Sequence, residues 1–134
     1  MAIWIGIAFT VIIIPALMII CGKYYIKKVP KNINHFVGYR TTRSMKNKET
    51  WKFAHNYMGK LWYKYGIVLF VISAVLMLLT IGQDEDAVGG LAAIITMVQV
   101  FVMIVPGVLT EKALKENFDE EGNRKAENLK NRNL

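Results

Sequence analysis

Few side chains in this sequence could support catalysis or bind a metal. His35 and His55 are the only histidines, and neither has a carboxylate or thiol at ligand spacing, so no zinc site is expected. We interpret both as loop or interface residues. The single cysteine, Cys21, cannot form an internal disulfide. The sequence has no nucleophile elbow, phosphate-binding loop or acid pair at catalytic spacing. We therefore predict that the protein is not an enzyme and uses no metal or cofactor.

An acidic segment near the carboxyl end, Asp119-Glu120-Glu121, is the other candidate for metal chemistry. It lacks the alternating acid positions and the later bidentate glutamate of a calcium loop. We predict a solvated turn there, after a short continuation of the preceding helix.

A polar stretch between residues 34 and 44 could bind a partner. It contains Asn34, the run Gly38-Tyr39-Arg40-Thr41, and Ser44. Composition alone fits a simple connector whose arginines contact lipid phosphates. The alternative is a binding site, and its residues would then need to be positioned by the elements on either side.

Those elements are three apolar runs without a Lys, Arg, Asp, Glu or His. They extend from Ala2 to Cys21, from Gly66 to Gly82 and from Ala87 to Thr110. About 20 helical residues cross a bilayer, and backbone amides in lipid must be satisfied within the segment. We predict an all-α membrane protein with a transmembrane helix at residues 1–22 and a transmembrane hairpin at 66–110. A cleaved signal peptide is not expected, because basic residues follow the first run and none precedes it.

Charge is distributed unevenly between the runs. The short link after the second run carries three acids and no base, and the tail at 111–134 holds six of each. The segment 23–65 has one acid, Glu49, and eleven basic residues: Lys23, Lys27, Lys28, Lys31, Arg40, Arg43, Lys46, Lys48, Lys52, Lys60 and Lys64. Positive loops stay in the cytoplasm. We predict that the amino terminus is outside and that residues 23–65 and the tail are cytoplasmic, beside anionic lipid headgroups. Direct binding of nucleic acid is not expected.

The segment 48–65 predicts an amphipathic helix. Asn47 can cap it, and Glu49 suits its positive end. At 100° per residue, its apolar side chains form one stripe, and lysines lie opposite: Trp51, Ala54, Met58, Leu61, Trp62 and Tyr65 in the stripe, Lys52, Lys60 and Lys64 opposite. We favour a helix lying flat in the inner interface with Gly66 as a hinge. The alternative is an upright extension of the second span, which needs a partner to cover its apolar stripe.

Polar and helix-bending residues within the runs predict contacts between helices. Pro15 and Pro106 should kink their helices without breaking them, because neighbouring helices can satisfy the freed carbonyls. Gln99, near the middle of the third run, should hydrogen-bond a neighbouring helix.

The sequence also resembles the SdpI (SdpI/YfhL) family of small bacterial membrane proteins. The resemblance covers roughly Pro30 to Leu109 and ends in two closely linked spans. Its motif residues are Asn34, Gly38, Tyr39, Arg40, Thr41, Ser44, Trp51, the region from Ala54 to Asn56, Gly59 and Gly66.

This resemblance implies a location in the bacterial cell membrane and a role in immunity. The best known member protects its producer from a secreted toxic peptide and holds a transcriptional repressor at the membrane. That member is longer, with extra membrane segments ahead of the matching unit. We hypothesise that residues 34–66 pack under the spans, held by Arg40 and Trp51, with Arg40 pairing to lipid phosphate or helix-end carbonyls. A small transporter or a structural membrane subunit is the alternative, although the spans lack the ionisable residue that coupled transport usually needs.

Overall fold

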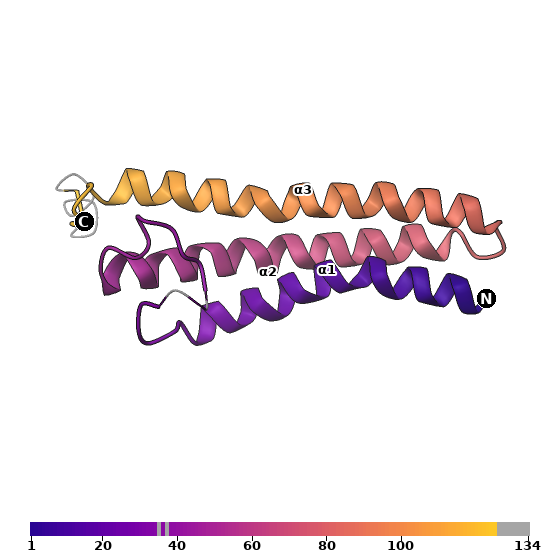
Figure 1. Cartoon of the computed structure of the whole chain (residues 1–134), viewed down its shortest axis with the longest axis horizontal. Helices are drawn as coiled ribbons and strands as arrows, with labels where there is room; N and C mark the ends of the chain where they lie inside the picture. Colours follow the sequence, from indigo (N-terminus) through magenta and orange to yellow (C-terminus); the bar gives the residue numbers. More distant parts are fainter. Residues whose placement is uncertain (35, 37, 126–134) are drawn as a thin grey trace.

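The computed structural model describes residues 1–34, 36 and 38–125, which form three long α-helices. Helix α1 spans Ala2–Lys27, α2 spans Lys48–Leu78 and α3 spans Glu85–Asn117. They lie side by side in alternating directions, so the amino terminus and the α2–α3 turn share one end of the bundle (Figure 1). The α1–α2 loop and the chain after α3 share the other end, which we call the loop end.

All three helices are long and apolar enough to cross a membrane. Large apolar side chains remain exposed around the bundle, and Phe9, Met97 and Phe101 are exposed to 68%, 73% and 70%. Lipid suits such a surface, whereas soluble monomers rarely expose apolar patches of this extent. The architecture is that of an all-helical, multi-pass membrane protein, as the sequence predicted.

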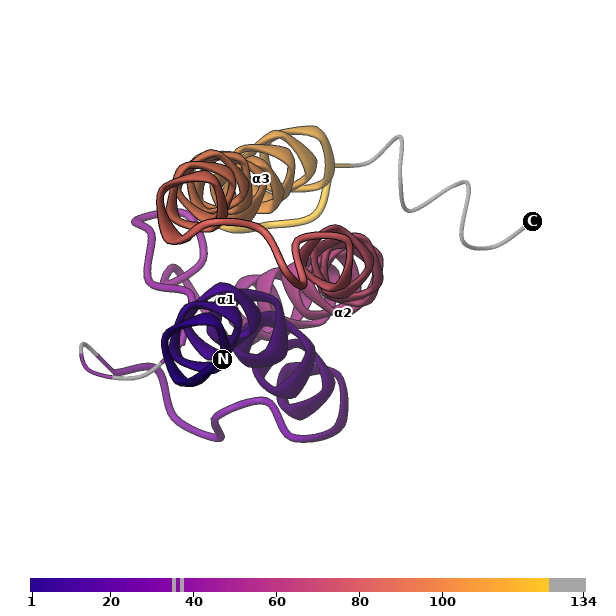
Figure 2. The same cartoon turned by 90° about the vertical axis from the view of Figure 1, so that its right-hand side faces the viewer.

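Seen along its length, the bundle has α1, α2 and α3 at the corners of a triangle (Figure 2). Two buried apolar clusters lie between the helices. One is toward the amino-terminal end and the other is at the loop end: Val11, Met77, Val88, Ala92 and Ile95 in the first, Ala54, Leu114 and Phe118 in the second.

The predicted flat interfacial helix is not a separate element. Residues 48–65 form the first half of the single helix α2, upright and continuous with the second span. Its apolar stripe is covered from within the chain, since Trp51 and Ala54 are only 2% and 0% exposed. The amino-terminal start of this helix is as predicted: the Asn47 side chain accepts from Thr50 N–H, and the Thr50 hydroxyl accepts from Asn47 N–H. The favoured placement was wrong because the loop end itself supplies the covering partner.

Gly66 is a packing residue in this structure and not a hinge. It lies inside α2, and a Cβ added there would be 2.9 Å from Ile19 Cγ1 on α1. Closer to the loop end, a Cβ on Gly22 would be 2.6 Å from Tyr63 N, and one on Gly59 would be 2.9 Å from Gly22 O. Small residues let membrane helices approach at backbone distance. The α1–α2 pair therefore uses Gly22, Gly59 and Gly66 as its line of contact.

The prediction for Gln99 is confirmed, and neither Pro15 nor Pro106 breaks its helix. Helices α1 and α3 continue through Pro15 and Pro106. Because proline has no N–H, Pro15 leaves the Val11 carbonyl without its helical donor. Gln99 Nε2, from α3, donates to that carbonyl at 3.0 Å and to Ser73 Oγ of α2 at 2.8 Å. One fully buried side chain thus joins all three helices.

Both ends of α3 are fixed by side-chain contacts. Asp84 caps its start by accepting from Ala87 N–H at 2.9 Å. After Asn117 the chain makes the predicted turn, closed by a bridge between Phe118 and Arg124. Arg124 pairs with Glu49 at the start of α2. The predicted tail beyond residue 125, like His35, lies outside the described residues.

Candidate functional site

A compact turn forms the centre of the site. The Thr41 N–H donates to Ser44 Oγ at 2.9 Å, and the Ser44 N–H donates to Thr41 Oγ1 at 3.2 Å. The buried Ser44 hydroxyl also lies 3.0 Å from the Tyr39 carbonyl oxygen, to which it donates. The Thr50 hydroxyl then donates to the Ser44 carbonyl at 3.0 Å, which joins the turn to the first turn of α2. Short hydroxyl side chains suit such local bonds to backbone groups.

Gly38 brings the loop backbone against His55. Its φ is +105°, a conformation that favours glycine. A Cβ here would be 2.2 Å from His55 Nε2. The next residue, Tyr39, donates its backbone N–H to His55 Nε2 at 2.9 Å, and His55 Nδ1 lies 2.7 Å from the Trp51 carbonyl oxygen. Since Nε2 accepts and Nδ1 donates, this fully buried imidazole is neutral in this arrangement.

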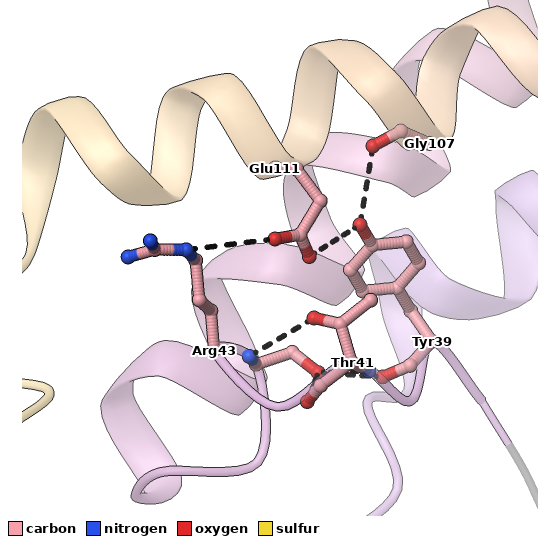
Figure 3. Close-up of polar contacts among 6 residues, drawn as sticks. Tyr39, Thr41, Arg43, Gly107 and Glu111 are labelled. Atoms are coloured by element: carbon pink, nitrogen blue, oxygen red, sulfur yellow. Dashed lines mark hydrogen bonds and ion pairs between the residues drawn. The ribbon is translucent and has the colours of Figure 1, made fainter. Parts of the chain in front are cut away.

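Tyr39 connects the same loop to α3. Its hydroxyl donates to Glu111 Oε1 at 2.8 Å and lies 3.1 Å from the Gly107 carbonyl oxygen (Figure 3). Arg43 Nε is 3.9 Å from the other oxygen of Glu111, so the carboxylate lies between the tyrosine and the guanidinium (Figure 3). Burial, and then the hydrogen bond to Glu111, raise the pKa of the Tyr39 hydroxyl well above its ordinary value. The hydroxyl therefore stays protonated as a donor.

Trp51 fixes the end of α1 against α2. Its indole Nε1 donates to the Pro30 carbonyl at 2.9 Å, and its ring centroid is 4.2 Å from that of His55. Buried tryptophans usually satisfy this N–H. The indole thus links α2 to the segment that follows α1, at Pro30, which lies outside the residues 34–66 that Trp51 was expected to hold.

A cavity of about 380 Å³ opens beside this network. Its lining combines a guanidinium, two phenol rings, an indole and two thioethers: Arg40, Tyr25, Tyr39, Trp62, Met45 and Met58, with Gly38 and Thr41. Apolar walls with a few polar groups are typical of small-ligand and peptide pockets. Chemically, the cavity suits an amphiphilic ligand that places an anionic or carbonyl oxygen near Arg40 and apolar groups against the rings and sulfurs.

The predicted site residues divide into three groups in the structure. Gly59 and Gly66 belong to the α1–α2 contact and not to the cavity. Asn34 bonds within its own loop, donating to the Asn32 carbonyl and accepting from the Phe36 N–H. The others converge at the loop end: Gly38, Tyr39, Arg40, Thr41, Ser44 and Trp51.

Three further residues complete the site: His55, Thr50 and Glu111. His55 lies within the motif region from Ala54 to Asn56 but was interpreted as a loop or interface residue, and Thr50 and Glu111 were not predicted to belong to the site. His55 follows Trp51 by four positions, a spacing that places both on one side of a helix. Thr50 stands three residues after the predicted cap, where a capping partner belongs. Glu111 gives no comparable signal, because only the return of α3 brings it beside Tyr39.

Most residues of the site lie in the part of the chain that a known family matches. The sequence model of the SdpI/YfhL protein family matches residues 31–110, which include the loop, α2 and most of α3. Neither a curated protein nor a solved structure gives a significant match to the chain.

Proposed function

Because the chain belongs to the SdpI/YfhL protein family, we propose that it is an immunity-type membrane protein that protects the cell from a secreted, membrane-active toxic peptide. The observation that carries the proposal is the convergence of six family-motif residues on one end of the bundle, four of them on one cavity. No catalytic step is needed for this role. Protection by binding needs a shaped, amphiphilic surface, and the cavity at the loop end has that character.

The proposed orientation has the amino terminus outside and the loop end in the cytoplasm. The eleven basic residues of segment 23–65 support it, because positive loops are retained inside. The acids Asp84, Glu85 and Asp86 lie at the opposite end of the bundle, near the amino terminus. In cells that carry Cys21→Ser, a cysteine replacing Glu85 should react with an impermeant thiol reagent, and one replacing Lys46 should not. The reverse labelling would overturn this orientation.

Arg40 is the proposed ligand contact in the cavity. Its planar guanidinium can bond several oxygens at once, whether on a peptide backbone, a carboxylate or a phosphate. Trp62, Met45 and Met58 would then contact apolar side chains of the same ligand. Met and aromatic side chains adapt to peptides of varied shape.

The test is survival of cells that carry the Arg40→Ala variant. A toxin-sensitive host expressing the wild-type chain should survive the cognate peptide, and the Arg40→Ala variant should not, at equal membrane level. Arg40→Lys keeps the positive charge but loses the planar guanidinium that can bond several oxygens at once, and should protect partially. Lys46→Ala, which removes a charge from the exposed part of the same loop, is the matched control and should protect fully. Full protection by Arg40→Ala would reject the site.

Sequestration of a cytoplasmic regulator is a second candidate role. The observation that favours it is the cavity's position at the loop end, which the proposed orientation puts in the cytoplasm. A DNA-binding repressor encoded beside this protein should then move to the membrane fraction in wild-type cells exposed to the toxin, and remain soluble with Arg40→Ala.

A small transporter is the remaining alternative. In the middle of the bundle, Gln99 Nε2 donates to Ser73 Oγ and to the Val11 carbonyl. The apolar runs hold no ionisable Lys, Arg, Asp, Glu or His side chain. Coupled transport usually depends on such a side chain. Reconstituted vesicles distinguish the roles: toxin-specific survival without solute flux supports immunity, and flux of a small cation or drug supports transport.

A further inference from the structure

A second hollow, which shares no lining residue with the cavity above, lies between the end of α1, the chain that follows it and the first turns of α2. Its volume is about 910 Å³. We call it the basic groove, because five lysines line it and no acid does. They come from three segments: Lys27 from α1, Lys28 and Lys31 from the loop, Lys48 and Lys52 from α2.

The fold brings these lysines, which come from three segments, around one hollow. The Trp51 indole N–H bonds the Pro30 carbonyl, which holds residues 28–31 beside α2. Lys48 and Lys52 are four residues apart and so point the same way from α2. Trp51 itself is buried and also lines the groove. The bond from Trp51 to Pro30 therefore sets the two lysine-bearing segments, residues 28–31 and the first turns of α2, side by side.

The positive charge of the groove is not balanced from within the described part of the chain. The nearest acid on α2, Glu49, pairs with Arg124 and lines a different hollow. Within residues 1–34, 36 and 38–125, none of the five lysines forms an ion pair with a carboxylate. Like charges gathered around one hollow create a positive potential that favours an anion.

The position of the groove relative to the membrane indicates which kind of anion it would bind. Tyr24 lines it, close to the end of the first apolar run, where aromatic rings sit at headgroup level. Ile26, Val29 and Trp51 add apolar contacts beside the lysines. A headgroup phosphate with its glycerol and upper acyl chain presents the matching order of charge and apolar surface. Basic pockets at this depth are typical sites for anionic lipids.

We propose that the basic groove binds the headgroup of one anionic phospholipid from the leaflet at the loop end. This inference depends on the membrane location alone and is independent of the proposed protective role. The bound lipid would contact the chain around Pro30 and Trp51, and the Trp51 ring packs against His55.

The test compares two triple variants that remove equal charge. The groove variant is Lys31→Gln/Lys48→Gln/Lys52→Gln, and the control is Lys60→Gln/Lys115→Gln/Lys125→Gln, whose lysines line other hollows. Full-length proteins in neutral detergent are titrated with phosphatidylglycerol or phosphatidylcholine and measured by native mass spectrometry. Each lysine near a headgroup contributes about fivefold in affinity, so the groove variant, which loses three, should bind phosphatidylglycerol at least roughly tenfold more weakly. The control should lose less than about twofold.

Further variants and controls separate loss of the binding site from loss of folding and from unspecific charge effects. The charge-preserving variant Lys31→Arg/Lys48→Arg/Lys52→Arg should retain binding, and the helix content of every variant should match the wild type by circular dichroism. Equal loss in the groove and control variants would overturn the proposal in favour of diffuse charge. Tighter binding of a single-stranded oligonucleotide than of phosphatidylglycerol, lost in the groove variant, would overturn it in favour of nucleic acid.

Discussion

The spanning part of the bundle and its loop end are held together by different interactions. In the spans, α1 and α2 touch through glycines, and a single polar side chain, Gln99, joins the three helices. At the loop end, side chains bond backbone groups and join the α1–α2 loop to α3 and to α2, as Tyr39 and Trp51 do. In lipid, apolar side chains gain no hydrophobic free energy by moving into a helix–helix contact. Association of the spans therefore depends on how closely the helix backbones pack. Near water, specific polar bonds can shape a cavity, and that is where the candidate site lies.

Gly22→Ala tests the close approach and should have the largest effect. Its Cβ would lie 2.6 Å from Tyr63 N and 2.7 Å from Gly59 O, both backbone atoms that cannot rotate away. We expect a loss of about 3 kcal/mol in the free energy of unfolding, at the upper end of overpacking effects. Denaturation in mixed micelles, followed by circular dichroism, measures it.

The matched control for Gly22→Ala is Gly90→Ala. Gly90 also lies within a helix, but nothing is within 4 Å of its Cβ position. This change should be neutral or stabilise by up to about 1 kcal/mol, because alanine favours helix. If both variants lose equal stability, the glycine contact is not what holds α1 to α2.

Gly38→Ala makes the corresponding test at the loop end. The new Cβ would meet His55 Nε2 and would also force a left-handed φ on alanine. We expect a loss of about 2 kcal/mol, within the range for strained backbone positions. Because His55 is the obstacle, Gly38→Ala and His55→Ala should be non-additive, with the double variant less impaired than the sum. Strict additivity would show that the two residues are not in contact.

Gln99→Leu tests the polar contact within the spans. It leaves the Val11 carbonyl without a donor, and we expect a loss of about 1 kcal/mol, typical of interhelical hydrogen bonds in membranes. Pro15→Ala restores a backbone N–H that can bond that carbonyl within α1. In the Pro15→Ala background, the cost of Gln99→Leu should therefore be smaller. An unchanged cost would mean that the glutamine acts through Ser73 alone.

Tyr39→Phe should have the smallest effect, below about 1 kcal/mol, because Glu111 keeps Arg43 as a partner. The contribution of the Tyr39 hydroxyl should instead be visible in how stability depends on pH. The pKa of Tyr39 is raised in the folded state above its ordinary value of 10.0. The folded state thus keeps a proton that the unfolded state loses, so this contribution to stability is present below pH 10.0 and declines above it. The difference in stability between wild type and Tyr39→Phe should narrow above that pH; a constant difference would contradict the assignment.

The sequence predicted the elements better than their contacts. Apolar runs identify spans because lipid acts on each segment separately, and the Asn47 cap is a local signal. The placement of residues 48–65 could not be predicted in the same way. Whether Trp51 faces lipid or protein depends on where residues 28–31 and α1 return in space, which periodicity does not encode. For the same reason, the sequence could not show that Gly66 packs against α1, and it was expected to act as a hinge.

By itself, the sequence determined a three-helix membrane protein, its family and the motif around Gly38-Tyr39-Arg40-Thr41. These follow from the composition of continuous segments and from residue order. Only the tertiary structure decided that His55 accepts from Tyr39, that Glu111 meets the same tyrosine from α3, and that five lysines line one groove. Those contacts join residues from different segments of the chain, and they form only where the folded helices bring the α1–α2 loop beside α2 and α3.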